Sequence, residues 1–272
     1  MKQGSKQLGK AFLGLALGLV WLIPFYLMLT NSFKTKQEIF TNPLKFPEAF
    51  TFENYPEAFR QLDFIRTLAN SLLITVSSVI IIVIFSAMAA YALERIKSKF
   101  STVTFMVFVA AMLVPFQSVM IPLVALFGKA QMLNQIGIIF MYLGFGGSMS
   151  IFLYHGAMKS IPRALDEAAI IDGASRWQVF WKVIFPMLKP TTVTVAVLNT
   201  MWIWNDYLLP SLVINSPTTQ TIPLKMFFFF GQYTKQWHLA LAGLVIAILP
   251  VIIFYFFMQK QIIKGVADGA VK

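Results

Sequence analysis

The chain has 272 residues, of which 58% are hydrophobic and only 12% are charged, and its mean hydropathy is +0.72. Soluble domains have about 25% charged residues, so this composition excludes a soluble protein and indicates a membrane protein. The absence of Cys excludes disulfides, thiolate metal sites and thiol catalysis. The net charge of +11 does not indicate nucleic-acid binding, because Lys and Arg lie in short clusters beside apolar segments, where they set topology.

Several apolar segments are long enough to cross a bilayer, which takes about 20 helical residues for a hydrocarbon core about 30 Å thick. These segments are 11–30, 69–93, 102–123, 136–157, 191–214 and 239–258. The first follows three lysines, as a signal peptide does, but its length and the lack of an A-x-A site before Lys34 favour a retained helix. The sequence therefore predicts an all-α membrane protein, with six transmembrane helices in one domain spanning residues 1–272.

The distribution of Lys and Arg predicts the orientation of these helices. Placing both termini in the cytoplasm puts most of the 22 Lys and Arg residues inside. Those left outside lie mainly in the long loop between residues 31 and 68, where acidic residues nearly cancel them. We therefore expect the polar loop 158–190, between the fourth and fifth predicted helices, to be cytoplasmic.

This loop has the signals of two short helices joined by a sharp corner. Residues 163–171 are mostly good helix formers, and Gly173 supplies the left-handed residue that ends such a helix. Ser175 is followed three residues later by Gln, which fits a capping box and starts a second helix at once. Pro186 and Pro190 are expected to end that helix.

Each short helix has a face suited to contact. Leu165 shares a face with two alanines, whose small size permits close approach by another surface. The second helix has a stripe of large apolar residues at helical spacing: Trp177, Phe180, Trp181 and Ile184. An amphipathic helix anchored among lipid headgroups is an alternative explanation of this stripe.

The loop resembles the EAA motif of the membrane subunits of ATP-binding-cassette importers, E-A-A-x3-G-x9-I-x-L-P. The matching residues are Glu167, Ala168, Ala169, Gly173 and Pro186, while Val183 and Phe185 are apolar replacements of Ile and Leu. The flanking sequence IPRALDEAAIIDGAS is similar to the version in carbohydrate importers, specifically the second permease subunit of the maltose and multiple-sugar type. FTFENY, WNDYLLP and the tail GVADGAVK agree with that subfamily, each weakly.

This resemblance implies that the loop is a coupling helix seated in a cleft of a cytoplasmic ATPase. The residues it assigns to ATPase coupling are Glu167, Ala168, Ala169, Asp172, Gly173 and Pro186. It also implies a multi-pass protein of a prokaryotic cytoplasmic membrane, working with a second homologous permease subunit, two ATPase subunits and an extracytoplasmic sugar-binding protein. ATP and Mg²⁺ are expected on the ATPases, because this chain has no G-x-x-x-x-G-K-[ST] loop, and no cofactor is expected here.

The sugar pathway is harder to locate from sequence. Polar and aromatic groups inside membrane helices are costly unless they face a partner or a water-filled cavity. The candidates are Trp202, Asn205, Asp206 and Gln117. An aromatic belt, structural hydrogen bonds or helix–helix contacts are alternative roles. The external loop residues Asn215, Ser216, Thr218 and Thr219 are candidates for contact with the sugar-binding protein, with an ordinary surface loop as the alternative.

Other functions stay open at this point. An importer of the same class for a polyol, glycerol phosphate or peptide has the same pattern. An ion-coupled transporter or channel acting alone would leave the EAA loop unexplained, and an enzyme would need clustered catalytic residues. His155 and His238 are far apart in sequence and lack an H-E-x-x-H motif, so no metal site is expected.

Overall fold

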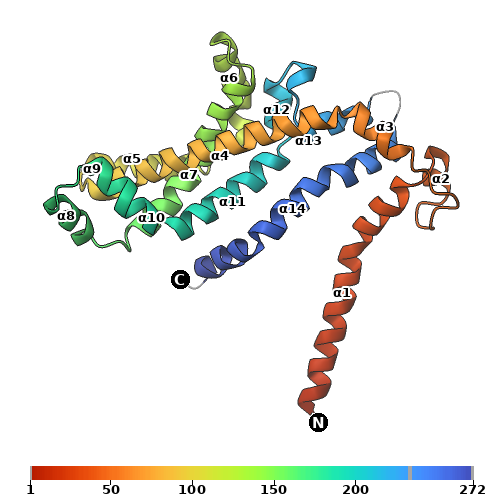
Figure 1. Cartoon of the computed structure of the whole chain (residues 1–272), viewed down its shortest axis with the longest axis horizontal. Coiled ribbons are helices and arrows are strands. Elements are labelled where there is room, and N and C mark those ends of the chain that lie inside the picture. The colour runs from red at the N-terminus through yellow and green to blue at the C-terminus, as the bar shows by residue number, and fades with distance from the viewer. Residues whose placement is uncertain (1, 232–234, 271–272) are drawn as a thin grey trace. The chain divides into compact units, whose positions relative to one another are not determined.

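The computed structural model describes the backbone of residues 2–231 and 235–270, and the side chains of residues 10–231 and 235–260. The described backbone is almost entirely helical (Figure 1). It divides into two compact units, residues 1–64 with 225–253, and residues 65–224 with 254–272. The single domain expected from sequence stays a prediction.

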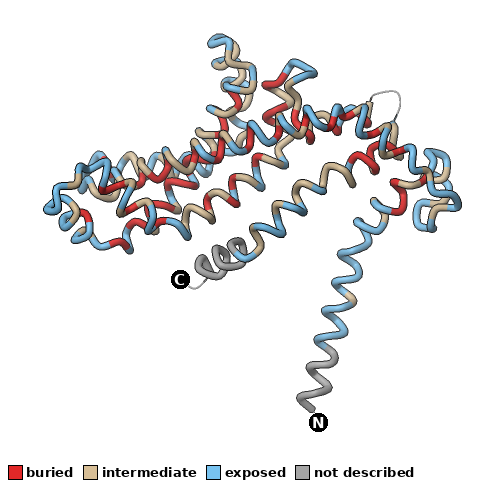
Figure 2. The backbone as a smooth tube through the Cα atoms, viewed as in Figure 1, coloured by how far each residue is buried: buried red, intermediate tan, exposed pale blue. Residues whose placement is uncertain are grey.

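The first unit contains α1 Lys2–Ser32, α2 Lys36–Thr41, α3 Asn54–Gln61, the 3₁₀ turn Phe227–Phe229 and the first part of α14 Trp237–Ala270. Its loop is held by Lys34, whose buried Nζ donates to Asn31 Oδ1 at 3.0 Å and to the carbonyls of Asn42 at 2.8 Å and Lys45 at 2.6 Å. Along the described part of α1 almost every apolar residue is exposed (Figure 2). Such a helix requires lipid or another protein around it.

The second unit is built on α4 Phe64–Arg95, α7 Gln135–Met158 and α11 Lys189–Asn205. Its other helices are α5 Lys99–Ala111, α6 Phe116–Lys129, α8 Ala164–Ile171, α9 Arg176–Val179, α10 Phe185–Met187, α12 Leu208–Val213 and α13 Ile222–Met226, of which α13 runs on into the first unit. A π-helix covers Phe180–Ile184 and a 3₁₀ turn covers Pro217–Thr219. α8 and α9 lie at the end of α4 where α5 begins, and α6 and α12 lie toward its other end (Figure 1).

Small residues let α7 pack closely against α4 and α11. Ser86 on α4 donates to the Gly147 carbonyl at 3.5 Å, and the Asn199 amide on α11 donates to Ser150 Oγ at 3.0 Å. A Cβ at Gly146 would collide with the Asn199 side chain. These polar contacts therefore join α7 to its neighbours, as polar side chains commonly do between membrane helices.

Two predicted transmembrane segments are broken in the structure. The segment 102–123 becomes α5 and α6, bent by 105°, because Pro115 lacks an N–H and restricts the residue before it. The segment 191–214 becomes α11 and α12, separated at Asp206. Among the described residues, four continuous helices are long and apolar enough to span a membrane, or up to six if each of two bent pairs is one span. The count of six and the cytoplasmic termini stay predictions.

Candidate functional site: the coupling loop

The corner between α8 and α9 forms as its residues predict. Gly173 has φ of +86°, and it follows the end of α8, where Ala174 N donates to the Ala169 carbonyl at 2.9 Å. Ser175 caps α9 by accepting from Gln178 N, while the Gln178 side chain accepts from Ser175 N at 2.8 Å. The left-handed glycine and the capping box are both confirmed.

The second short helix ends between the two prolines, as predicted, but one residue past Pro186. The chain continues through the π-helix and α10 to Met187 and bends at Leu188, so that the segment Arg176–Met187 meets α11 at 76°. A widened turn with Phe185 N bonded to the Phe180 carbonyl directly precedes the proline. Such a turn relieves the clash that a proline ring makes with the preceding turn of a helix.

The apolar stripe of this segment packs mainly inward. Val179, Phe180 and Ile184 are buried in the core of the second unit, and the Phe180 ring lies 5.4 Å from the ring of Tyr91 on α4. Trp181 is half-buried, whereas Trp177 remains 60% exposed. The stripe therefore fastens α9 and the π-helix to the membrane helices and leaves one Trp at the surface.

A buried acidic residue that sequence reasoning missed fastens α8 to α4. The Asp166 carboxylate lies 2.9 Å from Arg95 Nη2 and accepts a hydrogen bond from the Tyr91 hydroxyl at 2.8 Å. Arg163 donates to the Glu94 carbonyl at 2.6 Å, which adds a second link to the same end of α4. Tyr91 and Arg95 are four residues apart on one helix face, but no local signal connects them to a residue more than seventy positions later.

The predicted coupling residues lie on the outer side of this attachment. Glu167, Ala168, Asp172, Gly173 and Pro186 are exposed, and Ala169 is half-buried against the core. Ile171 is 85% exposed and Ile170 is 50% exposed beside them. A hollow of about 550 Å³ borders Glu167 and Ile170 and is lined by Arg95, Arg163 and Arg176. The site is thus an exposed apolar surface with basic groups beside it, and the contacts of Asp166 and Arg163 attach it to the end of α4.

The four pathway candidates do not gather at one place. Trp202 packs edge-on against Tyr142 and lines a hollow of about 290 Å³ together with Asn199 and Gly146. Asp206 is engaged structurally: Tyr142 donates to its Oδ2 at 2.9 Å, and the Leu208 amide donates to its Oδ1 at 2.9 Å, which caps α12. The two remaining candidates, Asn205 and Gln117, are exposed, and neither lines that hollow.

The loop that carries Asn215, Ser216, Thr218 and Thr219 is short and anchored. Asn70 on α4 donates to the carbonyls of Thr218 at 2.9 Å and Gln220 at 3.0 Å, and Gln135 on α7 donates to Asn70 Oδ1. Asn215, Ser216 and Thr218 remain exposed at the tip. Sequence reasoning placed the loop but missed the polar residues that hold it.

Two other expectations concern the absence of a metal site and the C-terminal tail. In the described part of the chain, no group of three or more His, Cys, Asp or Glu side chains gathers as metal ligands would. The side chains of the tail 265–272, whose sequence GVADGAVK agrees with the subfamily, lie outside the described residues.

Comparison with known proteins identifies the family of the chain. The family of binding-protein-dependent transport system inner membrane components matches residues 82–268. The probable starch degradation products transport system permease protein of Thermoanaerobacterium thermosulfurigenes is 58% identical, over 96% of this chain and 95% of that protein. The multiple sugar-binding transport system permease protein of Streptococcus mutans is 36% identical, over 94% and 93%.

A solved structure gives the same fold. A chain of a bacterial ABC transporter involved in the import of the acidic polysaccharide alginate superposes with a TM-score of 0.80 at 24% identity, covering 96% of this chain and 97% of that one. The resemblance drawn from the EAA segment is confirmed at the level of the family. The chain therefore belongs to the binding-protein-dependent transport system inner membrane components, which are multi-pass transport subunits and not enzymes.

Proposed function

We propose that this chain is one of two permease subunits of an ATP-driven sugar importer in a prokaryotic cytoplasmic membrane, with an oligosaccharide as substrate. Relatives named for starch degradation products and for multiple sugars support the substrate class. The second permease and the sugar-binding protein complete the pathway. Two ATPases bind the ATP and Mg²⁺, and one of them docks on α8 from the cytoplasm, where both termini of this chain also lie.

The observation that carries the proposal is the contrast between the two sides of α8. Its outer side presents Ile171 and Glu167 to solvent, which suits docking into a cleft of another protein. Its inner side carries Asp166, which is ion-paired to Arg95 at the end of α4. A displacement imposed on α8 by the ATPase is therefore passed to α4, and through Phe180 and Ile184 to the rest of the helical core.

For the pathway, we propose that sugar passes along the hollow beside Trp202, with Asn199 behind it. An aromatic face beside a polar amide is a common arrangement for binding a sugar ring. Gln117 and Asn205 are exposed and can line the same passage once the second permease encloses it, whereas Asp206 maintains the break between α11 and α12. The exposed tip at Asn215, Ser216 and Thr218, with neighbouring Thr219, faces the sugar-binding protein in this arrangement.

The docking of α8 is tested by ATPase co-purification. We expect Ile171→Asp to reduce the amount of ATPase recovered with the affinity-tagged chain about tenfold or more, because a charge replaces a side chain buried on docking. Phe40→Asp, which changes an exposed apolar residue of α2 outside the loop, is the matched control. Undiminished recovery with Ile171→Asp, or equal loss with the control, contradicts the proposal.

A crosslinking experiment makes the contact direct. The natural chain has no Cys, so a single Ile171→Cys variant carries one thiol in an otherwise native protein. A short bifunctional reagent should join it to the ATPase and not to the sugar-binding protein. Crosslinks to the sugar-binding protein alone would place the loop on the other side of the membrane and overturn the proposed orientation.

A further inference from the structure

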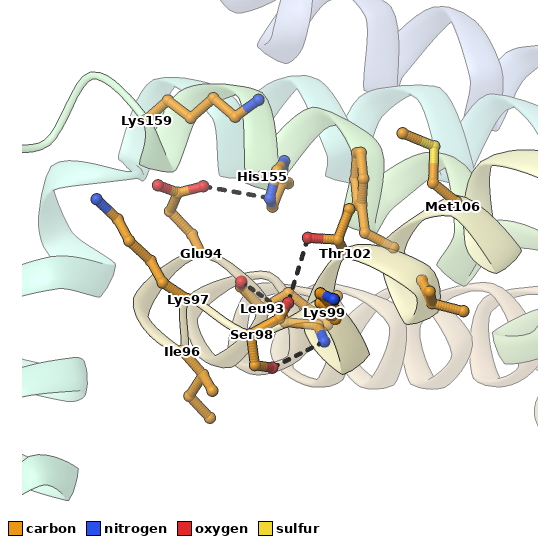
Figure 3. Close-up of a pocket in the computed structure, with 13 residues that line it drawn as sticks. Leu93, Glu94, Ile96, Lys97, Ser98, Lys99, Thr102, Met106, His155 and Lys159 are labelled. Carbon is orange, nitrogen blue, oxygen red and sulfur yellow. Dashed lines mark hydrogen bonds and ion pairs between the residues drawn. The ribbon is translucent and has the colours of Figure 1, made fainter.

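A second pocket lies at the corner between α4 and α5, away from the coupling surface. It has a volume of about 700 Å³, within the range of small-ligand sites, about 300–1,000 Å³. The end of α7 forms its third wall through His155 and Lys159. Figure 3 shows that side chains from all three helices border this hollow.

The pocket has an excess of positive charge. Lys97, Lys99 and Lys159 line it and are exposed, and within the described residues none of them forms an ion pair. The acidic residue in the lining, Glu94, lies 3.2 Å from His155 Nε2, and their contact is drawn in Figure 3. The ammonium groups are therefore available to an anion.

The rest of the lining is apolar and continues onto the outer surface of α5. Val103 and Met106 belong to the lining, and Val103 is 61% exposed. Phe105 closes the wall toward α7, with its ring stacked 3.9 Å from His155. A soluble anion such as phosphate makes no favourable contact with this apolar border. A lipid has a charged headgroup for the lysines and acyl chains for the apolar border in the same molecule.

We propose that this pocket binds the phosphate headgroup of an anionic membrane lipid, with its acyl chains along α5. Basic pockets between transmembrane helices at the cytoplasmic side bind such headgroups in general. The three lysines hold the phosphate, and Val103 and Met106 contact the acyl chains. The assignment to the inner leaflet rests on the orientation given under the proposed function, but headgroup binding itself does not.

Lipid binding by the purified full chain tests the proposal without any ATPase. Native mass spectrometry measures adducts of phosphatidylglycerol and of phosphatidylcholine with identical acyl chains. We expect phosphatidylglycerol to be preferred and each of Lys97→Gln, Lys99→Gln and Lys159→Gln to weaken it about fivefold. The triple pocket variant, which combines these three changes, should bind the two lipids equally. The control triple variant Lys36→Gln, Lys45→Gln, Lys129→Gln removes the same number of charges from exposed positions outside the pocket and should bind as the natural chain does.

Several outcomes would contradict the proposal of a lipid headgroup site. Equal binding of the two lipids, unchanged phosphatidylglycerol binding in the pocket variants, or equal loss in the control triple variant contradicts a specific headgroup site. Displacement of the lipid by millimolar inorganic phosphate indicates a soluble anion instead. Circular dichroism of each variant shows that the helices are intact, and the single variants retain a readout should the triple pocket variant fail to fold. Because no ATPase is present, a failure of the coupling proposal leaves these results unaffected.

Discussion

The ion pair that fastens α8 to α4 gives the sharpest prediction. Replacing Arg95 by Met removes the charge that faces Asp166 but retains most of the side-chain volume. The two side chains are only 13% and 11% exposed, so water screens them little. We expect the variant to lose stability and to hydrolyse ATP with little sugar uptake, because the displacement of α8 is no longer passed to α4.

The size of the effect follows from what Asp166 retains. Removing one partner of a buried pair costs about 3–5 kcal/mol, because the other charge is left unpaired. Here the Tyr91 hydroxyl still donates to the carboxylate at 2.8 Å, so we expect the lower end, about 3 kcal/mol. Asp166→Asn in the same background removes the orphaned charge. The double variant should therefore be more stable than the sum of the single variants predicts, by about 1–2 kcal/mol.

The measurement is a double-mutant cycle on the free energy of unfolding in mixed micelles, with uptake and ATP turnover measured in the assembled complex. The matched control is the pair Arg60–Glu57, whose side chains approach to 2.7 Å but are 78% and 35% exposed. Its removal should leave stability almost unchanged, because water screens an exposed ion pair. Additivity within about 0.5 kcal/mol for Arg95 and Asp166, or normal uptake in Arg95→Met, would refute the reasoning.

Two further predictions use backbone conformation and burial. Gly173→Ala places a Cβ in open space but at φ of +86°, so it should lower the free energy of unfolding by about 1–2 kcal/mol and impair uptake. The control Gly156→Ala also places its Cβ in open space, but within a helix, so it should leave thermal stability unchanged or raise it. Lys34→Met leaves several carbonyls of the loop 42–45 without their hydrogen-bond donor and should make that loop sensitive to limited proteolysis. Lys45→Met changes an exposed side chain and should leave the loop resistant. Equal cleavage of the two variants would contradict this role of Lys34.

The helical nature of the chain is predictable from sequence because it depends on runs of apolar residues and on local signals. The capping box at Ser175 and the left-handed Gly173 each involve residues within five positions of one another. Bends are less predictable. Pro115 directly precedes α6 and breaks an apolar run, whereas the helix passes Pro186 by one residue, after a π turn, and ends at Met187. The sequence contains no local sign of that widened turn.

The interactions that make the site rigid are long-range, which explains why sequence reasoning missed them. Asp166 precedes the EAA residues and looks like another solvated charge until α4 is placed beside it. Asn70 and Gln135 look like isolated polar residues near helix ends until folding joins their side chains to each other and Asn70 to the loop at Thr218. In each case the outward residues were identified and the inward partners were not, because partners are set by tertiary packing.

The end of α4 connects the two surfaces described above. The Glu94 carbonyl accepts from Arg163, next to α8, while its carboxylate pairs with His155 in the wall of the lysine pocket. Arg95, the next residue, holds Asp166. A displacement of α8 therefore reaches a helix end that also borders the proposed lipid headgroup. If a bound lipid holds the corner between α4 and α5 in the headgroup layer, a force applied to α8 would rotate α4 about that corner and not translate it across the membrane.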